Sequence, residues 1–334
     1  MGIRVLKEGM LTTVQDLGRI GYQSQGFGVS GAMDSRSCKI ANLLLDNPEN
    51  EAVLEFTLIA PKIQFTSETI IAITGGDFAP MVNKEPVKMY TALYMHRGDI
   101  LEFSGCKNGS RGYIAFSSYL DVPVVMGSRS TNLKCEIGGY RGRRLLKDDY
   151  VGFRIKRRYL PYFLSRTLTL NEFSDENITL RVVLGPQSEY FTKKGLETFL
   201  NNEYTITSDF DRMGCRLDGP YIGYKKTTDI ISDGTALGSI QVPSHGKPII
   251  LLADRQTAGG YAKIANIVSV DIPKLVQLKT DNTVRFEAIT VEEAQKLLKE
   301  EVKEVNTFIE QIYTPCKEVL DCRLVAKRLT KLFK

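Results

Sequence analysis

The sequence lacks the features of a membrane protein, a disordered protein and a nucleic-acid-binding protein. No apolar run approaches the roughly 18 residues that a membrane-spanning helix needs, and charges occupy the start of the chain, where a signal peptide has its apolar segment. The net charge of +5 is small for 334 residues. With 43% apolar and 25% charged residues, the composition is that of a globular protein. We therefore expect a cytoplasmic protein of about two domains, with no membrane and no nucleic acid among its partners.

Cysteine and histidine are too few and too scattered for a metal centre. The six cysteines contain no CxxC pair, and only two histidines occur, His96 and His245. Zinc ribbons, thioredoxin chemistry and disulfide frameworks all lack their usual spacing. We expect buried, reduced thiols, peripheral histidines and no metal site.

Several catalytic patterns are also missing. The phosphate-binding pattern GxxxxGK[ST] is absent, because Gly246-Lys247 is followed by Pro248 instead of a hydroxyl residue. The chain has no GxSxG elbow, no HExxH and no Ala-Met-Lys context for biotin attachment. A nucleotide would have to bind in another way, and we expect no biotin on this chain.

One basic cluster, at residues 141–158, interrupts the balanced charge. It contains eight basic residues and two acidic ones, Asp148 and Asp149. Such a cluster is typical of a solvated loop or interface patch, and the alternative is a site for an anion or a partner.

Glycines separate short apolar stretches along most of the chain, which is typical of β-rich folds. The patterns predict strands at 70–74, 100–103, 113–116, 180–184, 249–253 and 283–286. The strands at 100–103 and 113–116 flank a turn-rich segment and predict a hairpin. We expect a mainly β fold, of the β-rich α+β class.

Helical signals are fewer. A helix is predicted at 35–45 with Asp34 as its N-cap, and a longer one begins with the capping box Thr290 and Glu293. Pro315 is expected to end that helix, and 317–333 to form a second, basic helix for packing or subunit contact. A shift in composition near 159–180 leads us to divide the chain into an N-terminal β-rich subdomain (1–165), a β subdomain (166–290) and a helical extension (291–334).

Polar residues beside glycines mark four candidate site segments, at 12–34, 127–131, 208–216 and 238–261. Glycines let backbone approach a ligand, and arginines near them suit carboxylate or phosphate groups. The apolar run 249–253 places Asp254, Arg255, Gln256 and Thr257 at its end, where sites are often built. Alternatively, Asp254 and Arg255 only satisfy each other and the neighbouring turns.

Eight ordered motifs in these segments resemble a known family. They are Thr12-Thr-Val-Gln-Asp-Leu-Gly-Arg19, Ser30-Gly-Ala-Met-Asp34, Gly127-Ser-Arg-Ser-Thr131, Gly185-Pro-Gln187, Asp211-Arg-Met-Gly214, Ser232-Asp-Gly234, Ile240-Gln-Val-Pro243, and Asp254-Arg-Gln-Thr257 with Gly259-Gly-Tyr261. Over about residues 3–290 the chain is similar to the biotin-dependent carboxyltransferase family. This family is also called allophanate hydrolase subunit 2, and it includes KipA and the C subunit of 5-oxoprolinase.

The resemblance implies cyclophilin-like β-barrel subdomains and a hydrolase that works as a hetero-oligomer. The expected function is that of the C subunit of an ATP-dependent 5-oxoprolinase, which hydrolyses 5-oxoproline to L-glutamate and is inactive alone. ATP with magnesium would act at the level of the complex, and the partners would be the B subunit (KipI-like, allophanate hydrolase subunit 1) and the A subunit (LamB/YcsF-like). One alternative is a KipA-type protein that binds a KipI-like inhibitor of a sensor histidine kinase. Another is a carboxyltransferase component of a urea carboxylase/allophanate hydrolase system.

The site residues that we predict on this basis fall into two groups. The expected catalytic residues are Asp16, Asp34, Asp254 and Arg255. The expected contacts to substrate or anion are Arg19, Ser30, Arg129, Arg212, Arg216, Gln241, Gln256 and Thr257. Arginines near glycine-rich backbone can neutralise carboxylate and phosphate charge as it develops.

Overall fold

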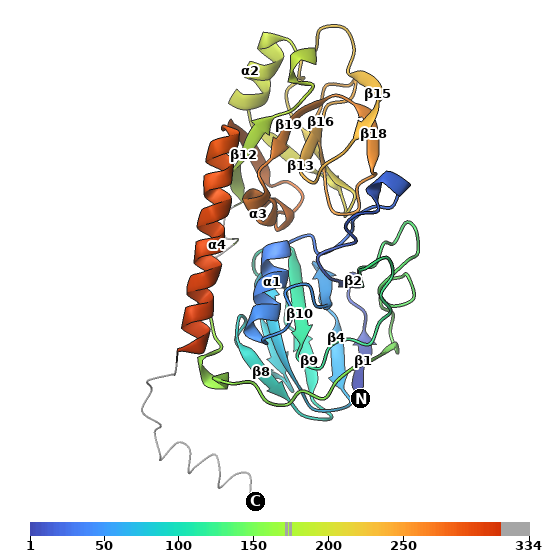
Figure 1. Ribbon diagram of the computed structural model, residues 1–334, viewed down its shortest axis with the longest axis vertical. Coiled ribbons are helices and arrows are strands. Elements are labelled where there is room, and N and C mark those ends of the chain that lie inside the picture. The colour runs from blue at the N-terminus through green and yellow to red at the C-terminus, as the bar shows by residue number, and fades with distance from the viewer. Residues whose placement is uncertain (171–172, 174–175, 315–334) are drawn as a thin grey trace, which may run out of the picture.

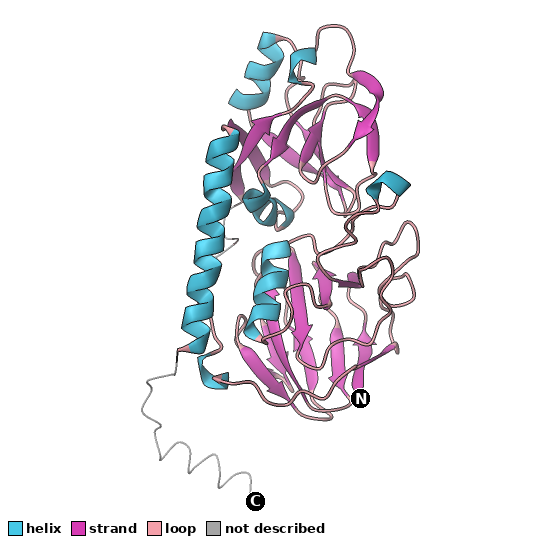
Figure 2. Ribbon diagram, viewed as in Figure 1, coloured by secondary structure: helices cyan, strands magenta, loops and turns pink. Residues whose placement is uncertain are grey.

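The computed structural model describes residues 1–170, 173 and 176–314, and it shows two β-rich units with a long helix running beside both (Figure 1). Strands dominate both units (Figure 2), and the second unit is a closed barrel. The expected β-rich fold with a barrel is therefore confirmed. Pro315, Cys316, Cys322 and the expected helix at 317–333 lie outside the described residues.

The N-terminal unit is a sandwich of two sheets. The first, in the order β11-β1-β4-β9-β6-β7, consists of β1 (Gly2–Lys7), β4 (Lys62–Phe65), β6 (Pro80–Val82), β7 (Glu85–Pro86), β9 (Ile100–Phe103) and β11 (Tyr150–Gly152). The second, in the order β2-β3-β10-β5-β8, consists of β2 (Leu11–Gln15), β3 (Val53–Thr57), β5 (Thr69–Gly75), β8 (Ala92–Met95) and β10 (Arg111–Phe116). Apolar side chains of both sheets, such as Ile3, Phe56 and Phe65, form the core between them.

The hairpin expected between 100–103 and 113–116 is wrong. Both segments are strands, β9 and β10, but β9 pairs with β4 and β6 while β10 pairs with β3 and β5. The connecting loop carries the chain from one layer of the sandwich to the other. Local turn signals could not show this, because the alternating apolar pattern fits any pairing partner.

The helix α1 (Ser35–Leu44) begins at Asp34, as expected, with the Asp34 side chain accepting a hydrogen bond from Ser37 N. It packs on the outer face of the second sheet, where Ile40 and Leu44 join Ala72 and Ala115 in a second core. The central strands β5 and β10 are consequently buried on both faces, which explains their continuous apolar sequences.

The second unit closes as a barrel in the order β12-β19-β16-β17-β14-β13-β20. Its strands are β12 (Asn177–Leu184), β13 (Tyr204–Phe210), β14 (Gly214–Asp218), β16 (Ser239–Gln241), β17 (Ile249–Leu251), β19 (Lys263–Ile267) and β20 (Thr283–Ala288). A separate ribbon pairs β15 (Asp229–Gly234) with β18 (Ala258–Tyr261), and the helices are α2 (Lys193–Asn201) and α3 (Ile272–Val276). The strand expected at 249–253 ends at Leu251. Short 3-10 helices lie at η1 (Gln23–Gln25), η2 (Phe163–Ser165), η3 (Ser188–Tyr190) and η4 (Ser269–Asp271).

The long helix α4 (Val291–Tyr313) begins with the expected capping box, in which Thr290 and Glu293 exchange hydrogen bonds. It contacts η4 of the second unit and η2 of the first, so it bridges the two units (Figure 1). Phe308 and Ile312 bury their side chains in the core beside α1. None of the described helices is both long enough and apolar enough to cross a membrane.

The cysteines and the basic cluster differ in part from expectation. Cys38 and Cys215 are buried free thiols, but Cys106 is only half-buried and Cys135 is exposed, so the expectation that all the thiols are buried was wrong. Within the basic cluster, Arg143, Arg154 and Arg157 form ion pairs with Asp149, Glu51 and Asp46. Much of that charge is thus neutralised within the chain.

The buried carboxylate of Asp271 predicts an acid-dependent contribution to stability. Its Oδ1 lies 2.6 Å from Arg181 Nη2 and 3.1 Å from Lys274 Nζ. Burial alone raises the pKa of Asp271, but the hydrogen bonds from Arg181 and the charge of Lys274 bring this pKa below its ordinary value. A lowered folded-state pKa gives stability that is present above the unfolded pKa, about 3.9, and is lost as the pH falls through the folded pKa.

We therefore expect Asp271→Asn to lose roughly 1.5–3 kcal/mol of unfolding free energy at pH 7. Urea unfolding from pH 7 to pH 3 should show the gap to the wild-type protein shrinking below about pH 4. Asp209→Asn, at an exposed ion pair, is the control and should change stability little. A gap for Asp271→Asn that stays constant down to pH 3 would contradict this assignment.

Candidate functional site

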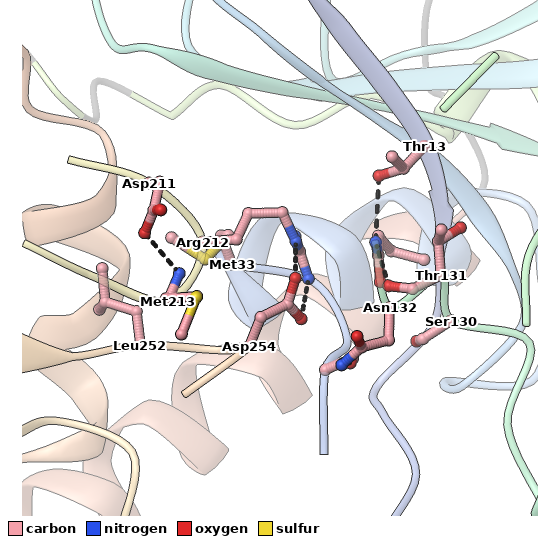
Figure 3. A network of polar contacts seen from close by, with 12 residues as sticks. Thr13, Met33, Ser130, Thr131, Asn132, Asp211, Arg212, Met213, Leu252 and Asp254 are labelled. Carbon is pink, nitrogen blue, oxygen red and sulfur yellow. Dashed lines mark hydrogen bonds and ion pairs between the residues drawn. The ribbon is translucent and has the colours of Figure 1, made fainter. Parts of the chain in front are cut away.

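A buried ion-pair network joins the two units. Arg212, in the turn between β13 and β14, donates to Glu55 of β3 and pairs with both carboxylate oxygens of Asp254, at 2.8 and 3.1 Å (Figure 3). It also donates to Gly31 O at 2.7 Å. Burial alone would lower the pKa of Arg212, but the charges of Glu55 and Asp254 raise this pKa above its ordinary value. Both predicted residues, Arg212 and Asp254, thus serve the contact between the units.

Tyr113 and Asp34 extend the same network. Tyr113 donates its hydroxyl to Glu55 and accepts from Asp34 N, each at 2.8 Å. The Asp34 carboxylate caps α1 and accepts from Gln277 Nε2, which follows α3, at 2.8 Å. Burial raises the pKa of Asp34. Asp34 therefore links the start of α1 to the barrel unit.

Asp16 holds the turn at residues 127–131 against the N-terminal segment. Its Oδ1 accepts from Gly18 N at 2.8 Å and from the hydroxyls of Ser128, at 2.7 Å, and Ser130. Its Oδ2 accepts from Arg129 N at 2.6 Å. With four donors around one carboxylate, Asp16 positions the turn that carries Arg129.

Two other predicted arginines, Arg19 and Arg129, have side-chain N–H groups that make no hydrogen bond within the described residues. The buried Arg19 donates to Ser130 O at 2.7 Å, yet its Nη1 has no hydrogen-bond partner among the described residues. Arg129 is half-buried, and its Nε also finds no partner in the described part of the chain. Buried donors are normally satisfied, so the turn at 127–131 offers unused N–H groups.

Arg255 is a buried cation without a counter-charge among the residues that the structure describes. Its side chain donates to Thr235 O and Leu252 O, at 3.4 and 3.2 Å, and none of the ion pairs found among the described residues involves it. Burial lowers the pKa of Arg255. Asp254 does not pair with Arg255, because it pairs with Arg212. The other part of that alternative, contacts of Arg255 to neighbouring turns, agrees with its hydrogen bonds to Thr235 O and Leu252 O.

The loop at residues 28–31 connects Arg255 with the turn at 127–131. Ser30 donates its backbone N–H to Ala253 O at 3.1 Å, and its hydroxyl accepts from Asn132 Nδ2 at 3.0 Å. At Gly28 a Cβ would lie 3.4 Å from Arg255 O and 3.5 Å from Asn132 Nδ2. Ser30 therefore links the first candidate segment to the fourth and to Asn132, the residue that follows the second segment.

A second group of unused donors lies where the barrel meets the ribbon. Gln241 of β16 and Lys263 of β19 are opposite each other in register, and both are buried. Lys263 Nζ lies 3.0 Å from Asp233 Oδ2, but the contact lacks hydrogen-bond geometry. Neither Lys263 Nζ nor Gln241 Nε2 has a hydrogen-bond partner within the described ranges.

Gly259 lies at the centre of this second group. Its Cα is opposite Asp233 in the ribbon, and a Cβ there would come within 2.5 Å of Gln241 Nε2 and 3.1 Å of Gln256 Nε2. Gln187 accepts from Lys263 N at 3.2 Å and donates to Asp233 at 3.3 Å. The close contact of Asp233 with the Lys263 ammonium, together with the charge of Lys263, lowers the pKa of Asp233. We name Gln187, Asp233, Gln241, Gly259 and Lys263 the ribbon cluster.

Comparison with known proteins decides the family. Residues 25–288 match the family model described as carboxyltransferase domain, subdomain A and B. The chain belongs to this carboxyltransferase domain family. It is 35% identical over 299 residues to the C subunit of 5-oxoprolinase from Haemophilus influenzae, covering 88% of this chain and 94% of that protein. The Escherichia coli protein of the same name is 35% identical over 300 residues, covering 88% of this chain and 93% of that protein.

A solved structure agrees with the family assignment. The urea amidolyase of K. lactis superposes with a TM-score of 0.85 at 28% identity, covering 92% of this chain. This chain spans only 20% of that much longer protein.

The predicted site residues lie in different parts of this carboxyltransferase fold. Ser30 lies in the loop at 28–31, which approaches the backbone of Arg255, and Gln241 and Gln256 lie beside Gly259 of the ribbon cluster. Arg129 lies in the turn that Asp16 holds. Gln256 and Thr257 accept hydrogen bonds from Thr235 through their backbone oxygens. Arg216 lies apart, exposed on β14 and 3.6 Å from Asp209.

Four residues of the ribbon cluster were missed as site residues by reasoning from the sequence. Gln187, Asp233 and Gly259 belong to three of the eight motifs, so a signal was present. Lys263 follows the motif Gly259-Gly-Tyr261 by two residues and carried no signal of its own. Its burial arises from barrel closure, which no local pattern encodes.

Proposed function

We propose that this carboxyltransferase domain protein is the C subunit of an ATP-dependent 5-oxoprolinase that converts 5-oxoproline to L-glutamate. The observation that carries the proposal is the match to the 5-oxoprolinase C subunit over 94% of that protein's length. The urea amidolyase relationship covers only a fifth of the larger protein. This chain thus covers nearly all of the first relative and a small part of the second.

The site chemistry supports a small substrate with a carboxylate and an amide. In the proposed arrangement, the guanidinium groups of Arg255 and Arg129 bind the carboxylate of 5-oxoproline. The N–H groups of Lys263 and Gln241 donate to the lactam oxygen, where negative charge develops when water adds to the carbonyl carbon. Asp233 holds the Lys263 ammonium in place. Arg129 Nε, Gln241 Nε2 and Lys263 Nζ have no hydrogen-bond partner among the described residues, which leaves donors for this assignment.

ATP and magnesium belong to the proposal only at the level of the complex. Among residues 1–170, 173 and 176–314, no group of three or more His, Cys, Asp or Glu is placed to hold a metal ion. The phosphate-binding pattern GxxxxGK[ST] is also absent. These residues do not fit a nucleotide with magnesium, and we assign no step on this chain to either.

The proposed partners are the B subunit, which is KipI-like, and the A subunit, which is LamB/YcsF-like, in the cytoplasm. We keep the division at 165–166 and 290–291 as part of this proposal. The similarity to urea amidolyase favours a second candidate, a carboxyltransferase component that works with a biotin carrier on another chain. That candidate predicts a dependence on biotin, which the first does not.

Substitution of Gly259 tests the ribbon cluster. In Gly259→Ala the new Cβ would meet Gln241 Nε2 at 2.5 Å, so the buried amide must move. A displacement of this size should lower 5-oxoproline turnover by the complex roughly 10- to 100-fold. Gly260→Ala is the matched control, because its nearest neighbour, Ile230 O, is 3.6 Å away. Equal turnover by both variants would remove the ribbon cluster from the site.

The purified chain alone should not catalyse the reaction. Candidate donors to the substrate are present, but the sequence lacks the GxxxxGK[ST] pattern and the described residues contain no group of three or more metal-ligating side chains. We expect no 5-oxoproline-dependent ATP hydrolysis by the single chain, and hydrolysis only after the two partner proteins are added. Robust turnover by the single chain would overturn this view. Binding of a KipI-like protein without turnover under any condition would instead favour the KipA-type regulator.

A further inference from the structure

The side chain of Gln187 contacts both members of the Asp233–Lys263 ion pair, although it has no part in the proposed function so far. Its Oε1 accepts from Lys263 N at 3.2 Å, and its Nε2 donates to Asp233 Oδ2 at 3.3 Å. The same Asp233 oxygen lies 3.0 Å from Lys263 Nζ. One amide therefore connects the strand that carries the cation with the ribbon that carries the anion.

The backbone before Gln187 explains why its amide reaches Lys263. Gly185 follows β12 directly and donates its N–H to Ile264 O at 2.8 Å. A Cβ at Gly185 would overlap Lys263 O, so this close approach of two backbones requires glycine. Pro186 then restricts the backbone between Gly185 and Gln187. The motif Gly185-Pro-Gln187 thus places the amide beside Lys263.

The ribbon alone holds Asp233 weakly. The ladder between β15 and β18 is irregular over the residues that precede Asp233, and Ile231 among them is 95% exposed. The Asp233 Oδ1 accepts from Gly234 N, within the ribbon, at 2.8 Å, whereas Oδ2 faces Gln187 and Lys263. Because a partly exposed ion pair restrains its partners little, the hydrogen bond from Gln187 supplies a direction that the ion pair lacks.

We propose that Gln187 is a positioning residue, whose amide keeps the Lys263 ammonium directed at the lactam oxygen of 5-oxoproline. This inference rests on the proposed function, which places that oxygen at Lys263 and Gln241. Charge on the oxygen grows as water adds, so the placement of the ammonium matters most in the transition state. Loss of the Gln187 amide should therefore lower kcat, whereas the carboxylate contacts of Arg255 and Arg129 keep KM nearly unchanged.

Two substitutions of Gln187, assayed in the reconstituted complex at neutral pH, separate positioning from the filling of space. Gln187→Met removes both hydrogen bonds at similar volume and should lower kcat roughly tenfold. Gln187→Glu keeps the shape and the acceptor for Lys263 N, but it places a second carboxylate beside Asp233 that competes for the ammonium. We expect its kcat to fall further, roughly 100-fold. A residue that only fills space would give the reverse order, because glutamate is nearly isosteric with glutamine.

Acetylation of Lys263 gives a readout that does not need turnover. The purified full chain is treated with sulfosuccinimidyl acetate, and acetylated peptides are quantified by mass spectrometry against the exposed Lys247. Lys263 is 4% exposed and should react slowly in the wild-type protein. In Gln187→Met we expect it to react roughly tenfold faster, because local opening of the ribbon becomes easier. Glu189→Met, at an exposed position two residues away, is the control and should match the wild-type protein in acetylation and turnover.

Failure of this inference is distinguishable from failure of the proposed function. If the wild-type complex releases no glutamate, the proposed function fails, and the acetylation rates alone decide whether Gln187 holds Lys263. If the wild-type complex is active, an unchanged kcat for Gln187→Met overturns the inference. Equal acetylation of Lys263 in the wild-type protein and in Gln187→Met overturns it as well. So does a Gln187→Met protein that melts earlier while its folded fraction keeps full activity.

Discussion

Replacing Arg212 by methionine should destabilise the protein by about 3–5 kcal/mol. The guanidinium is buried and pairs with Glu55 and Asp254, whose side chains are also buried. Methionine keeps much of the volume but leaves two carboxylates without a counter-charge away from water. The loss is measurable as a lower midpoint of urea unfolding.

The control for Arg212→Met comes from the same hairpin. Arg216→Met removes an arginine that is exposed and 3.6 Å from Asp209, so it should change stability by less than about 0.5 kcal/mol. If Arg212→Met were as stable as Arg216→Met, the network between the two units would contribute nothing, and Arg212 would be free to serve a ligand instead.

Replacing Lys263 by methionine should lower 5-oxoproline turnover by the complex about 100-fold, the usual effect of removing one donor to a developing negative charge. The fold should survive, because the Asp233 side chain is 53% exposed and remains hydrated when its cation is removed. Turnover and thermal unfolding measured on one preparation separate the two effects.

Lys247→Met is the matched control for Lys263→Met. Lys247 is also in the barrel unit and also forms an ion pair, with Asp218, but it is exposed. Its loss should leave turnover unchanged. A Lys263→Met protein that melts early while its folded fraction stays fully active would assign Lys263 a purely structural role.

Local sequence signals, each of which involves a few neighbouring residues, were sufficient to predict many of the helices and strands. The Asp34 cap predicted α1, and the box of Thr290 and Glu293 predicted the start of α4. Pairing between distant strands was not predictable in the same way. The strands β9 and β10 were found, but their partners lie elsewhere in the sequence, and proximity along the chain wrongly predicted a hairpin.

In the candidate site, too, the sequence motifs identified individual residues but not the distant residues that they contact. Motifs identified Arg212 and Asp254, but the role of Arg212 depends on Glu55, which belongs to no motif and lies 157 residues away. Arg255 was expected at the end of an apolar strand, and the structure adds that it is a buried cation without a described counter-charge. Lys263 becomes a candidate only when barrel closure places it opposite Gln241.

The most direct test of the proposed function is glutamate release from 5-oxoproline by this chain mixed with the KipI-like and LamB/YcsF-like partners and ATP, with and without avidin. The proposal predicts release that requires all three proteins and ATP and that avidin does not change. Avidin-sensitive carboxyl transfer, or no glutamate from the complete mixture, would contradict the assignment as the C subunit of a 5-oxoprolinase.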